Sequence, residues 1–284
     1  MITSVTLLAL IALVSILIFL RFRGKKQADW LRAQLVAPSH EAPLRFNPAM
    51  IETLPKPVQN YLGKAIASQA PLAHCVVLAM QGQIRLKPEG KWYDFTAKES
   101  LRDRFGFLWE ARVGKGLLPL FGGFDSFGPT AVSPVGVGTV RFWLLNLLPL
   151  VHQQGQRIDQ SSIGRLLMEH IWLPSALLPT QEIEWEAIDE NHIRYTLRVA
   201  SEPLTVEIGL DAQHRPVWVK AQRVRGEDGR LESFGGTFSD FGGFDGYYIP
   251  TALELGWGYG TENYRPFFKA TIRSARFLTS SAAT

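Results

Sequence analysis

The stretch of sequence that decides the fold is HCVVLAMQGQIRLKPEGKWYDFTA, residues 74–97. Val76, Leu78 and Met80 alternate in it with smaller or polar residues, and the alternation continues on both sides of a Pro-Glu-Gly turn at residues 88–90. A period of two is the pattern of a β-strand with one buried face. The stretch therefore predicts two consecutive antiparallel strands joined by a short turn.

Similar runs continue toward the C-terminus, separated by turns rich in Asp, Asn and Gly. Further strands are predicted at residues 107–113, 138–148, 182–187, 192–200, 205–210, 217–225, 231–238, 249–257 and 269–277. About ten or eleven strands are too many for a flat open sheet. The predicted fold class is therefore mainly β (α+β), with a strongly curved antiparallel sheet or half-barrel.

Two helices are predicted to cover the concave face of this sheet. Residues 55–66 begin with prolines, which suit the first turn of a helix, and carry apolar residues at helical spacing. Residues 159–172 begin at Asp159, a capping type of residue. Arg165 and Glu169 have the i,i+4 spacing of an ion pair on the face opposite the apolar one.

The N-terminus predicts one transmembrane helix. Residues 2–20 contain no charged residue, no proline and no glycine, and at 1.5 Å rise per residue they approach the roughly 30 Å thickness of the hydrocarbon core. A basic cluster of Arg21, Arg23, Lys25 and Lys26 follows directly. By the positive-inside rule, this cluster favours a single-pass protein whose domain lies in the cytoplasm. Alternatively, the cluster contacts anionic headgroups on whichever side it lies.

The chain divides in this interpretation into three parts. Residues 1–26 form the transmembrane anchor with its basic flank, residues 27–50 a juxtamembrane linker interrupted by prolines, and residues 51–284 a single β-rich globular domain. The net charge of +4 is accounted for by the four basic residues after the apolar segment. The domain is then close to neutral, which argues against nucleic acid as a partner and favours the lipid bilayer; a protein partner is left open.

Motifs for catalysis or cofactors are sparse. The six histidines are scattered without metal-ligand spacing, and Cys75 is the only cysteine. No nucleotide-binding motif has the strand and helix context that it needs. We therefore expect no metal, no cofactor and no catalytic residue. The one place where titratable groups adjoin an aromatic residue is Glu169-His170 beside Trp172, where the alternatives are a helix surface with a packed tryptophan and an acid/base site.

The remaining signal is the aromatic and apolar content of the strands. These side chains either fill the core or line an apolar cavity of the kind that binds lipids. The candidate ligand-binding residues are Trp109, Trp143, Glu169, His170, Trp172, Trp185 and Trp257. The long connection Gly114–Gly136 is either a pair of irregular strands packed into the core or a lid or interaction loop. Its candidate residues are Leu117, Leu120, Phe121, Phe124 and Phe127.

Several motifs resemble a family. The sequence EHIWLPSAL at residues 169–177 and the elements FSDF at 238–241 and IPT at 249–251 resemble an uncharacterised bacterial family of unknown function, over roughly residues 51–278. That resemblance implies no activity and no site residues. The hairpin around Gly246 is also similar to the closing hairpin of periplasmic lipoprotein carriers, which implies a half-barrel with a helical lid and an apolar cavity. Those carriers lie on the opposite side of the membrane from the one that the charge rule favours.

The leading functional hypothesis is a non-enzymatic, membrane-tethered binding protein for a lipid or a lipidated partner. A scaffold that docks another protein through an exposed sheet edge or the 117–127 loop is the first alternative. It requires a filled core and an exposed apolar patch. A hydrolase or transferase that uses Glu169 and His170 is the second, and it requires a cleft with shifted pKa values around these residues.

Overall fold

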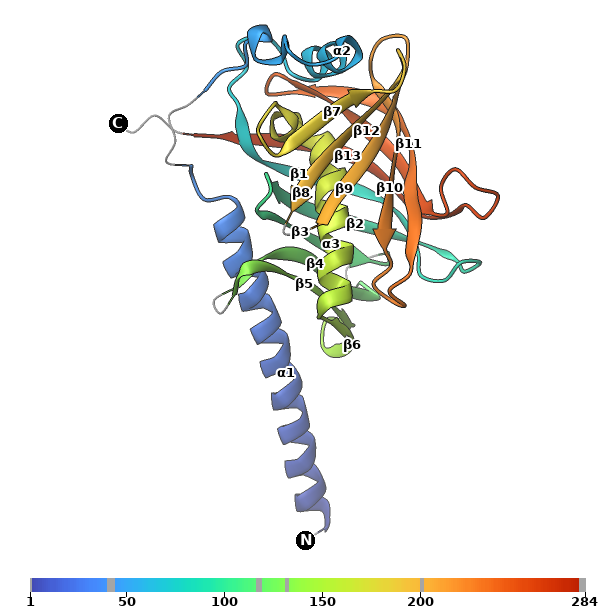
Figure 1. The fold of residues 1–284 in the computed structure, drawn as a ribbon. Helices are drawn as coiled ribbons and strands as arrows, with labels where there is room; N and C mark the ends of the chain where they lie inside the picture. The colour runs from blue at the N-terminus through green and yellow to red at the C-terminus, as the bar shows by residue number, and fades with distance from the viewer. Residues whose placement is uncertain (1, 40–43, 116–118, 131–132, 200–201, 281–284) are drawn as a thin grey trace.

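A computed structural model describes residues 2–39, 44–115, 119–130, 133–199 and 202–280. Its main element is one antiparallel sheet with the strand order β6-β5-β4-β3-β2-β1-β13-β12-β11-β10-β9-β8-β7 (Figure 1). The prediction of a mainly β, strongly curved antiparallel sheet is confirmed. The described residues contain 13 strands, more than the sequence predicts.

The sheet consists of two meanders. The first comprises β1 (Ala73–Arg85), β2 (Trp92–Arg102), β3 (Gly106–Val113), β4 (Phe121–Thr130), β5 (Ser133–Leu144) and β6 (Leu148–Gln153). The second comprises β7 (Ile183–Ala187), β8 (His192–Val199), β9 (Glu202–Leu210), β10 (Pro216–Val224), β11 (Leu231–Phe244), β12 (Tyr247–Trp257) and β13 (Arg265–Thr279). Antiparallel pairing of β1 with β13 joins them at the centre of the sheet.

The helices lie on different sides of this sheet. They are α1 (Ile2–Leu35), α2 (Lys56–Ala65) and α3 (Gln156–Glu169), with short 3-10 segments η1 (Pro48–Ile51), η2 (His170–Trp172) and η3 (Pro174–Leu177). Helix α3 connects the two edge strands, β6 and β7, and packs against β4 and β5 of one meander and β9 and β10 of the other. It therefore crosses the concave face, as Figure 1 shows.

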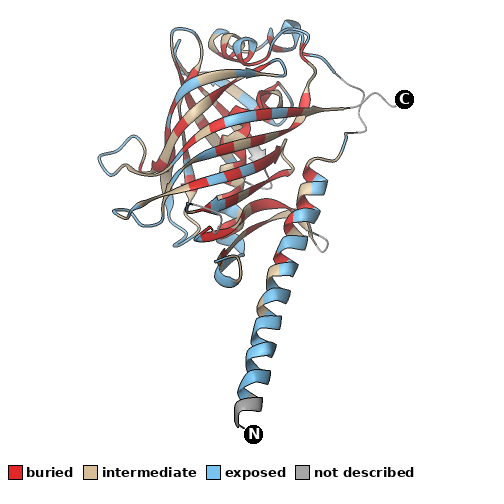
Figure 2. Ribbon diagram, turned by 180° about the vertical axis from the view of Figure 1, so that it is seen from behind, coloured by how far each residue is buried: buried red, intermediate tan, exposed pale blue. Residues whose placement is uncertain are grey.

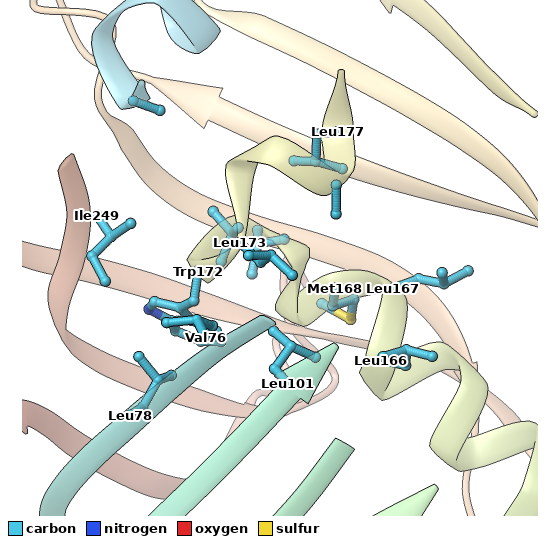
Figure 3. Close-up of a cluster of buried hydrophobic side chains, with 14 of the residues drawn as sticks. Val76, Leu78, Leu101, Leu166, Leu167, Met168, Trp172, Leu173, Leu177 and Ile249 are labelled. Carbon is cyan, nitrogen blue, oxygen red and sulfur yellow. The ribbon is translucent and has the colours of Figure 1, made fainter. Parts of the chain in front are cut away.

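The main core fills the part of the concave side around the end of α3. Leu166, Leu167 and Leu173 are fully buried there against Leu78 and Leu101 of β1 and β2 (Figure 3). The hydroxyl of Tyr195 on β8 donates a hydrogen bond of 2.5 Å to the carbonyl oxygen of Leu167. This packing fixes α3 to both halves of the sheet.

The C-terminal half of α1 packs on the convex face of the first meander. Ala28, Leu31 and Leu35 form a separate apolar cluster with Leu108, Phe124 and Trp143. Arg32 binds both carboxylate oxygens of Glu110, at 3.0 and 2.6 Å. The N-terminal half of α1 extends away from the domain with its apolar side chains exposed (Figure 2). Strands β3 to β5 are therefore covered on both faces.

The structure packs two parts of the predicted linker, residues 27–50, against the domain. Residues 27–35 continue α1 and contact the sheet. Phe46, in the last part of that segment, is buried in the main core. His40 to Pro43 lie outside the described residues. The three-part division of the chain stays a prediction.

Helix α3 begins earlier than the sequence predicts. Its first residue is Gln156 and its N-cap is Gly155, so Asp159 lies inside the first turn. The Asp159 carboxylate instead accepts a 2.7 Å hydrogen bond from the backbone N–H of Gly138 on β5. A capping type of residue serves here to tie the helix to the sheet.

We predict that Leu31→Ala lowers the free energy of unfolding by about 2 kcal/mol or more, because Leu31 is buried between α1 and the sheet. The measurement is denaturant unfolding of the full chain in detergent. Leu231→Ala, at an exposed position of β11, is the control and should change stability by less than about 0.5 kcal/mol. Equal stability of the two variants would contradict the observed packing of α1.

Candidate functional site

A cavity of about 610 Å³ lies between α3 and the concave face of the sheet. Its walls are mainly aromatic. The aromatic lining residues are Trp109, Phe121, Phe142, Trp172, Phe234, Trp257, Phe267 and Phe268. They come from β3, β4, β5, η2, β11, β12 and β13, so the cavity exists only because the curved sheet brings the two meanders to face each other.

The charged residues of the lining are mostly basic. The basic ones are Arg85, Lys87, Arg165, Arg223, Arg225 and Arg265, and the acidic ones are Asp125, Glu169 and Glu227. Three carboxylates outside the lining, Glu99, Asp228 and Glu232, form ion pairs with Arg165, Arg225 and Arg265, so the six cations are balanced by six acids. Arg223 is a buried cation of the lining that forms no ion pair among the described residues. Such a cation inside apolar walls favours ligands that combine an apolar body with an anionic group.

Arg165 of α3 is the centre of a buried ion network. Its guanidinium donates to Glu99 of β2 at 2.7 Å, to Asp125 of β4 at 2.7 Å and to Glu169 of α3 at 2.6 Å. The same group lies 4.4 Å from the ring centroid of Phe107. The network therefore pins α3 to two strands of the first meander.

The carboxyl groups of this network have shifted pKa values. Burial, helped by the nearby charge of Glu169, raises the pKa of Glu99 well above its ordinary value. Burial also raises the pKa of Glu169, although the charge of Arg165 opposes this shift. For Arg165, the three carboxylates outweigh burial and raise the pKa of the guanidinium. Arg165 thus stays charged, whereas Glu99 and Glu169 share a preference for the protonated form.

Arg223 of β10 is a second buried guanidinium in the cavity wall, with only 7% of the residue exposed. Its Nη2 donates a 2.9 Å hydrogen bond to the carbonyl oxygen of Ser161. Among the described residues no carboxylate lies within ion-pair distance of it, and its Nε has no hydrogen-bond partner. Burial, together with the charge of Arg165, lowers the pKa of Arg223 to about 10. The group therefore remains a cation at neutral pH. Among the described residues it has no ion-paired counterion, and the charges of Glu169 and Asp125 only partly offset the effect of burial.

Other polar atoms near this end of the cavity are also unsatisfied within the described part of the chain. They are Trp109 Nε1, Asp125 Oδ1 and Glu169 Oε2. A buried donor or acceptor without a partner costs about 1–3 kcal/mol. A polar group of a bound molecule, or water, would recover part of that cost. The cavity thus has an apolar portion and one polar end.

No group of three metal-ligating side chains is found in the described ranges. The closest approach to one is the set of carboxylates around Arg165, where the guanidinium occupies the position between the acids. This arrangement suits ion pairing and hydrogen bonding to a ligand.

The structure brings together four of the residues that the sequence nominated. Trp109, Glu169, Trp172 and Trp257 all line the cavity. Trp172 is additionally held by a 3.0 Å hydrogen bond from its Nε1 to the carbonyl oxygen of Pro250. Whether these residues bind a ligand stays a prediction.

Three other candidates lie outside the cavity. Trp143 is on the convex face against α1, because its neighbour Phe142 takes the concave face of the same strand. Trp185 packs between Tyr61 and Tyr195 and donates to the carbonyl oxygen of Leu177 at 3.0 Å. His170 is completely buried but does not line the cavity. The structure therefore does not bring Trp143, Trp185 and His170 together with the four residues that line the cavity.

The structure places three of the five residues proposed as a lid or interaction loop in a buried strand. Phe121, Phe124 and Phe127 lie in strand β4 and are buried, as in the alternative of strands packed into the core. Leu120 is exposed, and Leu117 lies outside the described residues. Strand β4 is hard to recognise in the sequence because its glycines and Asp125 interrupt the alternation of apolar and polar residues that is typical of a strand.

Sequence reasoning missed Arg223 and the role of Arg165. The i,i+4 pair of Arg165 and Glu169 exists, but it is buried and not on a solvated surface. The signal that was available is the position of Glu99 and Asp125 within apolar strands. A charged residue on the buried face of a strand needs a partner, and a cation on the covering helix is the nearest source.

Comparison with known proteins supports a family relationship. The model of a family of unknown function, DUF6544, matches residues 44–270. No curated protein matches. Solved structures with partial similarity include a putative outer membrane lipoprotein-sorting protein domain from Vibrio parahaemolyticus, with 11% identity, 72% of this chain and 85% of that chain covered, and a TM-score of 0.40.

Two further solved structures are similar at the same low level. A LolA superfamily protein from Nitrosomonas europaea has 12% identity to this chain and a TM-score of 0.36. The similar region covers 78% of this chain and 91% of that protein. A DUF1329 family protein from Desulfovibrio piger has 10% identity, covers 72% and 86%, and gives a TM-score of 0.39. The family of unknown function expected from the EHIWLPSAL motif is thus confirmed by the match over residues 44–270.

The ion network predicts opposite outcomes for two substitutions. Arg165→Met leaves three carboxyl groups without their cation and should cost about 3–5 kcal/mol of stability. Because the folded chain binds the Glu99 proton more tightly than the unfolded chain does, stability falls as pH rises above the ordinary value of 4.5. Glu99→Gln should therefore be at least as stable as wild type at pH 8 and show a shallower pH dependence. Denaturant unfolding at pH 5 and pH 8 measures both.

Glu227→Gln, at an exposed carboxylate of the cavity rim, is the matched control and should follow the wild-type pH dependence. If Glu99→Gln loses stability at pH 8 as strongly as Arg165→Met does, Glu99 is ionised in the folded protein and the assignment of a raised pKa is wrong.

His170 predicts a loss of stability in mild acid. Burial lowers its pKa from 6.5 to about 4, so below pH 6.5 the unfolded chain binds more protons than the folded chain. The stability lost between pH 6.5 and about pH 4 should amount to about 3 kcal/mol. His170→Leu should remove most of this loss, whereas the exposed-site control His152→Gln should retain it. The prediction would be refuted if the free energy of unfolding changed with pH by the same amount in wild type and in His170→Leu across this range.

Proposed function

The chain belongs to the family of unknown function DUF6544, and from this premise we propose that it is a membrane-tethered binding protein for a hydrophobic ligand, a lipid or a lipidated partner. The observation that carries the proposal is the cavity of about 610 Å³ with predominantly aromatic walls. Small-molecule sites have volumes of roughly 300–1,000 Å³ and are lined mainly by apolar and aromatic side chains with a few placed polar groups.

The polar end of the cavity supports an amphiphilic ligand. Arg223 is a buried cation without a counterion in the described chain, and it lies 4.2 Å from the ring centroid of Phe234 in the apolar wall. An acyl chain along the aromatic residues would place a carboxylate or phosphate next to this guanidinium. Such a contact is a charge-assisted hydrogen bond, which is stronger than one between neutral groups.

The tether is α1. This helix is long and apolar enough to cross a membrane, a property that membrane anchors share with signal sequences. We propose that α1 is a membrane anchor, in a bacterial inner membrane, and not a signal sequence. The basic residues at positions 21–26 follow the apolar segment directly, and the same helix then packs on the domain. The charge rule favours a cytoplasmic domain. A binding site held at the bilayer meets lipid at high effective concentration.

The two alternatives have less support. The scaffold hypothesis requires a filled core. A cavity of about 610 Å³ argues against a filled core. An enzyme that uses Glu169 with His170 needs both groups at the ligand, but His170 does not line the cavity.

The test is binding of palmitate to the full chain in detergent micelles, measured by native mass spectrometry and by displacement of a fluorescent fatty acid. We expect one palmitate per chain. Arg223→Met should weaken palmitate binding by about tenfold or more, since a charge-assisted hydrogen bond contributes about 1.5–3 kcal/mol. Binding of the corresponding fatty alcohol, which has no charge, should change little.

Arg230→Met replaces an exposed arginine of the neighbouring β10–β11 turn and serves as the matched control. It should leave binding of both molecules unchanged. A chain with no co-purifying lipid and no uptake of the fluorescent fatty acid would contradict ligand binding. Equal losses for palmitate and the alcohol in Arg223→Met would contradict only the role of its charge.

A further inference from the structure

The hairpin between β5 and β6 exposes an unusual apolar surface. Residues 142–151 read FWLLNLLPLV and contain no charged side chain. Leu145, Leu148 and Leu150 are 59%, 44% and 51% exposed. Leu120, which is 41% exposed, joins them, because its carbonyl oxygen accepts a 2.9 Å hydrogen bond from the backbone N–H of Leu145. We refer to these four side chains as the leucine patch.

The leucine patch lies next to the point where α1 leaves the domain. Trp143 lies one residue before the end of β5. It packs so closely on α1 that a Cβ added at Gly24 would lie 2.5 Å from its ring. The guanidinium of Arg21 lies 4.3 Å from the centroid of the same ring. One turn further toward the N-terminus, Leu17 is still partly buried, whereas the apolar side chains at positions 7–14 and 16 are exposed. Figure 1 shows β6 at the end of the domain toward which α1 continues.

We propose that the leucine patch contacts the lipid bilayer at the interface where α1 enters it. This inference rests on α1 being the membrane anchor of the proposed function. The basic residues Arg21 and Arg23 then lie at the headgroup level, where cations contact anionic lipids. Trp143 is buried against α1 and supports the guanidinium of Arg21 on its ring at this level. An exposed cluster of leucines is costly in water and stabilised when it is transferred into an apolar medium.

The same hairpin connects this membrane contact with the cavity. Leu150 is both exposed and part of the cavity lining, and Val151 beside it lines the cavity as well. An acyl chain could therefore pass from the bilayer along β6 to the aromatic walls without a step through bulk water. The arrangement gives the cavity an entrance on the lipid side.

The experiment places a nitroxide spin label at single engineered cysteines of the full chain in vesicles of phosphatidylethanolamine and phosphatidylglycerol. Leu148→Cys reports the hairpin, Leu10→Cys reports the exposed apolar part of α1, and Ile188→Cys reports the turn after β7, the edge strand opposite to β6. Cys75 is fully buried, and burial raises the pKa of its thiol to about 12, so the wild-type chain should take up no label.

Collisions with oxygen and with a water-soluble nickel chelate measure the depth of each label. We expect the label at position 148 to be several-fold less accessible to nickel than the label at 188, at a depth shallower than that at position 10. Equal nickel accessibility at 148 and 188, with position 10 protected, would overturn the leucine patch and leave the anchor intact. A water-exposed label at position 10 would overturn both, while palmitate binding, measured on the same samples, tests the cavity separately.

Discussion

The segment between β6 and β7 has to travel from one edge of the sheet to the other, and this constraint determines the rest of the structure. Because the sheet is strongly curved, the direct path leads across its concave face, and α3 takes that path. A helix there must satisfy polar side chains of strands that face inward. Arg165 does so by binding Glu99 and Asp125 on two different strands. The cavity is the space that α3 leaves open between the meanders.

Much of the fold follows from the sequence because one-sided burial produces a clear alternation. Strands β10 and β12 lie within about two residues of their predicted positions, and helix α2 matches the predicted prolines. Strand β4 is different. Phe124 faces α1 on one side of the sheet, while Asp125 faces Arg165 on the other. Both faces are covered, so no polar face remains to reveal the period of two.

The site was predictable only in part for a related reason. Tryptophans attract attention as candidate ligand contacts, but the face on which each one lies depends on the register of its strand. A single position separates Phe142 in the cavity from Trp143 against α1. Nothing in the local sequence marks Arg223. Its interest lies in being buried without an ion pair among the described residues, which is a property of the folded chain.

The continuity of α1 has a mechanical consequence. A domain on a flexible leader samples many heights and angles above a surface, so its opening points in all directions in turn. Here one helix of 34 residues contains the apolar segment and also packs on the sheet, where Arg32 forms an ion pair with Glu110. In the proposed membrane-anchored state, such a connection holds the domain in one orientation and at one height above the bilayer. A partner that exchanges ligand with the cavity then has to approach along the membrane plane.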